Sequence, residues 1–96
     1  MDVNQFIISL NEPKPPSALS SILEALWWDG KGDWAQAHEI AQEISDNNGS
    51  WIHAYLHRKE GDIWNADYWY RMAGRKRPET GLEQEWKDIV THFLNA

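Results

Sequence analysis

Apolar residues recur at helical spacing along most of the chain and divide it into five amphipathic segments. In the first, residues 17–31, Leu19, Ile22, Leu26 and Trp27 follow one another at intervals that place them on one helical face. Similar stripes predict further helices over residues 34–45, 50–60, 63–74 and 82–93. The pattern therefore predicts an all-α fold of about five helices. Residues 17–96 form a single helical-repeat domain in this reading, and residues 1–16, which lack a period, form an extended N-terminal segment.

The chain repeats itself after 29 residues. That shift superposes Gly32 on Gly61 and Asp33 on Asp62. It also superposes Ala25 on Ala54 and Ala37 on Ala66. Each copy reads as a helix, a Gly-Asp turn and a second helix, because glycine ends a helix readily and aspartate caps the next one. We expect two tandem helical hairpins, with the four alanines buried where helices approach. The helix from Leu82 should close the open side of the second hairpin as a C-terminal capping helix.

The spacing of small, aromatic and proline residues in the second copy resembles the tetratricopeptide repeat. The matching positions are Ala54, Gly61, Ala66, Tyr70, Ala73 and Pro78. More narrowly, the run WIHAYLHRKEGD at residues 51–62, followed by YWYRMAGR at 68–75, is similar to a group of short uncharacterised bacterial and fungal proteins. The resemblance implies helical hairpins and carries no activity with it.

Composition narrows the chemistry open to the chain. It has 96 residues and no cysteine, which excludes disulfides, thiolate metal sites and a cysteine nucleophile. It begins without the basic, long apolar stretch of a secretory signal and holds no run long enough to span a membrane. We therefore expect a cytoplasmic protein without a membrane partner. The net charge of −6 argues against a nucleic-acid partner.

An aromatic and basic stripe follows the segment 63–74. Trp64, Tyr68, Arg71 and Arg75 are spaced by four, three and four residues, opposite the apolar positions that should close the hairpin. Six of the nine basic residues lie between residues 58 and 77. Tryptophan, tyrosine and arginine are enriched at protein interfaces, although the same stripe could brace the fold through cation–π contacts. The sequence thus favours a small protein–protein interaction module that binds a protein partner or forms a homo-oligomer.

A second group of polar residues supports an alternative function. His53, His57 and Glu60 share one helical face, and two imidazoles one turn apart can bind zinc or a similar metal. The metalloprotease pattern is absent, because Ala54 follows the first histidine where that pattern has glutamate. The alternative is therefore a metal- or small-ligand-binding protein or an enzyme, unless these residues only line the seam between hairpins. His38 and His92 have no second candidate ligand at a spacing that would indicate a shared site. The sequence predicts no catalytic residue and no cofactor apart from this metal alternative.

Overall fold

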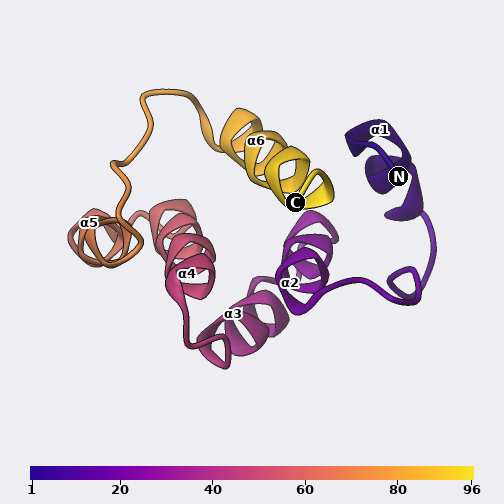
Figure 1. Ribbon diagram of the computed structural model, residues 1–96, viewed down its shortest axis with the longest axis horizontal. Helices are drawn as coiled ribbons and strands as arrows, with labels where there is room; N and C mark the ends of the chain where they lie inside the picture. The colour runs from indigo at the N-terminus through magenta and orange to yellow at the C-terminus, as the bar shows by residue number, and fades with distance from the viewer.

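The structure, a computed structural model, describes all 96 residues and contains helices without strands. Figure 1 shows the helices arranged around a shared centre, with α1 near α2 and α6, and α5 at the far end of the molecule. The all-α fold class is confirmed. The radius of gyration of 12.4 Å agrees with the roughly 12.5 Å of a compact domain of this length. The helices are α1 (Val3–Ser9), α2 (Ser21–Gly30), α3 (Trp34–Gln42), α4 (Asn47–Lys59), α5 (Ile63–Met72) and α6 (Leu82–Leu94).

Two antiparallel hairpins, α2/α3 and α4/α5, form the centre of the fold. Their turns have the same geometry: Gly32 and Gly61 take φ values of +89° and +81°, which favour glycine. Asp33 and Asp62 then cap α3 and α5, their carboxylates accepting from backbone N–H groups three residues on. The last residues of α2 and α4 are 29 positions apart, and so are the first residues of α3 and α5. The predicted pair of hairpins is therefore confirmed.

The predicted bounds of two helices were wrong at their N-termini. Helix α2 begins at Ser21 rather than Ser17, because Ala18 takes a positive φ of 67° and Ser20 provides the N-cap. Residues 47–49, which lie between the predicted helices 34–45 and 50–60, belong to α4, since the Asp46 carboxylate accepts from the N–H groups of Asn48 and Gly49 and starts the helix early. Gly49 is required there, because a Cβ would collide with the backbone carbonyl of Ile44. This contact fixes the close passage from α3 into α4.

Small residues bring the paired helices together. Ala25, Ala37, Ala54 and Ala66 are all completely buried, as the repeat predicts. Larger side chains fill the space around them, and the largest fully enclosed ones are Trp27, Tyr55, Tyr70, Phe6, Leu26, Ile52, Leu56, Ile89 and Val90. Close packing at these alanines brings the two helices of each hairpin near one another and fixes their separation.

The N-terminal segment contains a helix, so the prediction of an extended segment is wrong for Val3–Ser9. Asp2 and Gln5 form a capping box that starts α1, and the Phe6 side chain is fully buried. The Phe6 ring lies 5.8 Å from that of Trp86, centroid to centroid. The indole N–H of Trp27 also donates to the Ser9 hydroxyl, at 3.1 Å. Helix α1 is therefore part of the same core as α2 and α6.

Helix α6 closes the fold, but it covers more than the second hairpin. It packs against α1, α2 and α4, and the Trp86 indole donates to the backbone carbonyl of Leu26 at 3.0 Å. Its buried Glu85 accepts hydrogen bonds from Arg58 at 2.7 Å and from the Tyr70 hydroxyl at 2.6 Å. The first helices of both hairpins are covered in this way, and one face of α5 stays open to solvent.

Candidate functional site

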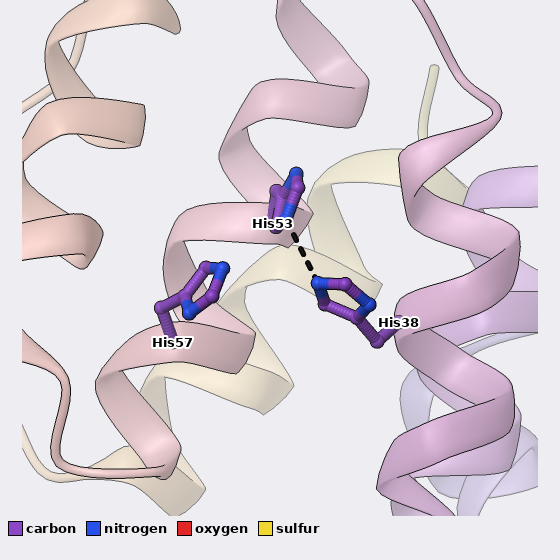
Figure 2. Close-up of side chains that lie close together, drawn as sticks. All are labelled: His38, His53 and His57. Carbon is purple, nitrogen blue, oxygen red and sulfur yellow. Dashed lines mark hydrogen bonds between the residues drawn. The ribbon is translucent and has the colours of Figure 1, made fainter.

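Three histidines meet where the first hairpin packs on the second. His38 comes from α3, and His53 and His57 come from successive turns of α4 (Figure 2). One ring nitrogen from each of the three lies within 4.8 Å of the other two. The Nε2 atoms of His38 and His53 are 2.9 Å apart, a hydrogen bond in which one ring donates and the other accepts. The packing of α3 on α4 thus creates a cluster of imidazoles that neither hairpin has alone.

Two tryptophans fix the planes of these rings. Trp34 stacks on His38 at 4.8 Å between centroids and 15° between planes. Trp69 stacks on His53 at 4.3 Å and 16°. The Trp34 indole is itself held by a 2.9 Å hydrogen bond to the backbone carbonyl of Leu56. His38 and His53 are therefore partly buried against aromatic rings, which limit the tilt of their planes.

The surroundings keep two of the rings neutral. Burial, with the nearby His38 and His57, lowers the pKa of His53 from 6.5 to about 4. Burial and His57 also lower the pKa of His38, and the negative charge of Glu60 opposes that change. A proton on His38 or His53 would be poorly solvated, and two positively charged rings this close would repel one another. At neutral pH both His38 and His53 therefore have a lone pair to offer.

His57 has an unusual environment on its other side. Its Nδ1 atom is buried and has no hydrogen-bond partner within normal distance. The nearest carboxylate oxygen, Oδ2 of Asp62, lies 3.7 Å away. Asp62 is ionised at neutral pH, as aspartate normally is, and a hydrogen bond from the Asn65 side chain lowers its pKa further. A carboxylate thus stands close to the back of this imidazole, where it favours a proton on Nδ1.

The structure brings together two of the three residues in the sequence-predicted ligand set. His53 and His57 are neighbours, whereas Glu60 is an exposed residue at the C-cap of α4 and is not part of the close cluster. His38 takes the third place. It lies fifteen residues from His53 in the chain, so only the packing of the hairpins joins them. The available signal was its position one turn after Trp34, on the helical face that meets α4.

The aromatic stripe on α5 divides into two parts. Trp64, Tyr68 and Arg71 face solvent, with 79% of Trp64 and 42% of Tyr68 exposed. Met72, which was not part of the stripe predicted from the sequence, continues this surface and is 52% exposed. We call Trp64, Tyr68, Arg71 and Met72 the α5 outer face. Arg75 departs from it, because its guanidinium lies 3.4 Å from the centroid of the Trp51 ring.

The surface has two hollows of interest, and only the first borders the residues described above. One, of about 430 Å³, lies between α3, α4 and α5 and is bordered by His53, Trp69 and Met72, so it connects the α5 outer face with the histidine cluster. The other, of about 370 Å³, lies between α1, α2, α4 and α6. The buried Asp29 carboxylate lines this hollow. It accepts hydrogen bonds from the Tyr55 hydroxyl at 2.7 Å and from the Lys59 ammonium at 2.9 Å. The Asp29 carboxylate is thus already satisfied by the protein.

No protein-family model, no curated protein and no solved structure matches the chain. The relation of its hairpins to the tetratricopeptide repeat stays a prediction. None of its helices has both the length and the apolar character needed to cross a membrane.

Proposed function

We propose that the chain is a cytoplasmic protein-interaction module whose α5 outer face binds an amphipathic helix of a partner protein. The observation that carries this proposal is the exposure of Trp64, at 79%, on a helix whose opposite face already packs the hairpin. Ala66 and Tyr70 supply that packing and are buried. Folding therefore does not require the aromatic side chains on the outer face.

The outer face has the composition and spacing of a helix-docking surface. Trp64, Tyr68 and Met72 follow one another at intervals of four residues and form an apolar ridge along α5. Such a ridge matches the i, i+4 anchors by which one amphipathic helix recognises another. Tryptophan, tyrosine and arginine are also the residues that most often dominate binding energy. The hollow beside Met72 would receive an apolar side chain of the partner.

Charge favours a different protein over a second copy of this chain. Arg71 is exposed beside the ridge and takes part in no salt bridge, and Lys76 is exposed just beyond the helix. The α5 outer face contains no carboxylate, so a two-fold contact between two such faces would give Arg71 no acidic partner on the opposing face. We infer that the partner helix has carboxylates along the margin of its apolar stripe.

Site-specific photo-crosslinking in cells tests the location of the contact. A photoreactive phenylalanine analogue replaces Tyr68 in the full chain, and the same analogue replaces Ile8, an exposed apolar residue on α1, as a control. We expect a discrete heterologous adduct from position 68 and none from position 8. Adducts only with a second copy of this chain would overturn the choice of partner.

Titration of the purified partner with variants then tests the energetics. Trp64→Ala should weaken binding at least about 30-fold, equal to roughly 2 kcal/mol, while the melting temperature stays near that of the parent. Ile8→Ala is the matched control, since it removes a similarly exposed apolar side chain elsewhere, and should bind as the parent does. Equal affinity of Trp64→Ala and the parent would contradict the proposal.

A further inference from the structure

The interaction proposed for α5 makes no use of the histidine cluster. We propose that His38, His53 and His57 together bind one divalent first-row transition ion of imidazole preference, such as Zn²⁺, which joins α3 of the first hairpin to α4 of the second. The ligand set differs from the one that the sequence suggested, because His38 replaces Glu60.

One separation in the cluster is close to that of a metal site, and the widest must shorten when an ion binds. Zinc lies about 2.0–2.1 Å from each imidazole nitrogen, so ligand atoms at tetrahedral positions are roughly 3.3 Å apart. Here the His38 and His53 nitrogens are 2.9 Å apart, and no pair in the cluster exceeds 4.8 Å. The first pair would open by a few tenths of an ångström and the widest would close. Rotation of side chains can supply these changes, since the rings already face one another (Figure 2).

Binding requires no net loss of protons from these ligands. The hydrogen bond between His38 and His53 uses the lone pair of one Nε2 and the N–H of the other. The ion takes up both lone pairs when the donating ring moves its proton from Nε2 to Nδ1. Each of the two rings then presents one nitrogen lone pair to the ion, as a transition metal requires of imidazole.

Residues behind the ligands resemble the outer shell of a metal site. A ligating histidine commonly directs its other ring nitrogen toward a carboxylate, and Asp62 lies 3.7 Å from Nδ1 of His57. That nitrogen is buried and otherwise lacks a partner. Trp34 and Trp69 hold the planes of His38 and His53 by stacking. In this proposal Nδ1 of His57 carries the proton and faces Asp62, while the other ring nitrogen binds the ion.

The number of ligands leaves one coordination position to solvent or to an added ligand. Three protein nitrogens make an open site, in contrast to the four ligands of closed structural zinc sites. The hollow of about 430 Å³ beside His53 gives a route to that position between α3, α4 and α5. Its far margin is Met72, on the α5 outer face. A bound ion would therefore lie at the inner end of the surface proposed to receive a partner.

Zinc titration of the untagged full chain, after treatment with a chelator and its removal, tests this proposal. Calorimetry should give one ion per chain and a rise in melting temperature with added Zn²⁺. Removal of an outer-shell residue costs about 10–100-fold in metal affinity, so His38→Gln, His53→Gln and His57→Gln should each lose at least about 100-fold. His92→Gln removes a histidine outside the cluster and should bind as the parent does.

Co²⁺ supplies a second measurement that does not depend on the stability of the variants. Bound to the parent in a site of this kind, it should show the intense visible bands of tetrahedral coordination, and Zn²⁺ should displace it. Equal zinc affinity of the parent and His38→Gln, or a parent without these bands, would overturn the proposal. So would loss of binding in Glu60→Gln with none in His38→Gln, because that result would restore the ligand set suggested by the sequence.

Discussion

The central carbon of the Arg75 guanidinium lies over the Trp51 ring, 3.4 Å from its centroid. This contact ties the segment after α5 to the beginning of α4, inside the second hairpin. It also separates Arg75 from Trp64, Tyr68 and Arg71, with which the sequence had grouped it. One member of the stripe thus braces the fold while the others remain available to a partner.

Arg75→Ala should therefore lower the stability of the fold without weakening partner binding. We expect a loss of about 0.5–1 kcal/mol in the free energy of unfolding, the usual range for an exposed cation–π pair. Urea denaturation of the two arginine variants measures it. Arg71→Ala, which removes an exposed arginine with no such contact, should unfold at the parent's midpoint. A larger loss for Arg71→Ala than for Arg75→Ala would reverse these assignments.

Ala66→Leu should destabilise the second hairpin. Ala66 is completely buried where α5 approaches α4, so added methylene groups have no space and would push the helices apart. Overpacking of this kind costs about 1–3 kcal/mol. The matched control is Ala35→Leu at an exposed position of α3. Thermal denaturation that fails to separate the two variants would show that the helices are not packed closely at Ala66.

Glu85→Ala should be among the most destabilising single changes in the chain. The buried carboxylate accepts from Arg58 and Tyr70, and the Arg58 side chain is only 14% exposed. Its removal leaves a buried guanidinium without its partner, which typically costs about 3–5 kcal/mol. Glu83→Ala, at a side chain that is 85% exposed, should cost little. Denaturant titration of both variants at neutral pH measures the contrast.

Acid should weaken the fold through the histidine cluster. The folded-state pKa of His53 is about 4 and its ordinary value is 6.5, so between these values the unfolded chain binds the proton more readily. Stability is therefore lost as the pH falls through this window. His38, whose pKa is also lowered, adds to the effect with the same sign, with Glu60 opposing it.

Melting temperatures measured in chelator from about pH 7.5 down to about pH 5 test this dependence. His53→Gln should flatten the profile, because it removes the group with the lowered pKa. His92→Gln, with a histidine removed from α6, should keep the parent's slope. If His53→Gln and the parent lose stability in parallel, the cluster is not the source of the acid sensitivity.

The sequence predicted those features that depend on neighbours in the chain. Gly32 and Asp33 define a turn by their own conformations, and Gly61 and Asp62 repeat it, so the hairpins could be read directly. Helix α1 was missed because seven residues span too few turns to show a period. The burial of Phe6 could not be predicted locally, because the ring it packs on belongs to Trp86, far away in the chain.

In the candidate site, too, the residues related by local spacing were predicted and the one brought in by packing was not. His53 and His57 were found because α4 alone places them one turn apart. His38 was overlooked since its relation to them arises from the packing of α3 on α4, which no local pattern records. Asp46 illustrates an ambiguity of a different kind: the same Asp-Asn-Asn-Gly run suits a turn or a capped helix start, and the contact of Gly49 with Ile44 favours the helix.

The packing of Phe6 on Trp86 joins the first helix to the last and has a consequence for biosynthesis. The two hairpins can form from short-range contacts while the chain is still being made. Helix α1 cannot reach its final position until residue 86 has left the ribosome, because its aromatic partner does not exist before then. Helix α1 therefore completes its packing only after α6 has been made, and the Phe6 side chain is left without this aromatic partner during that interval.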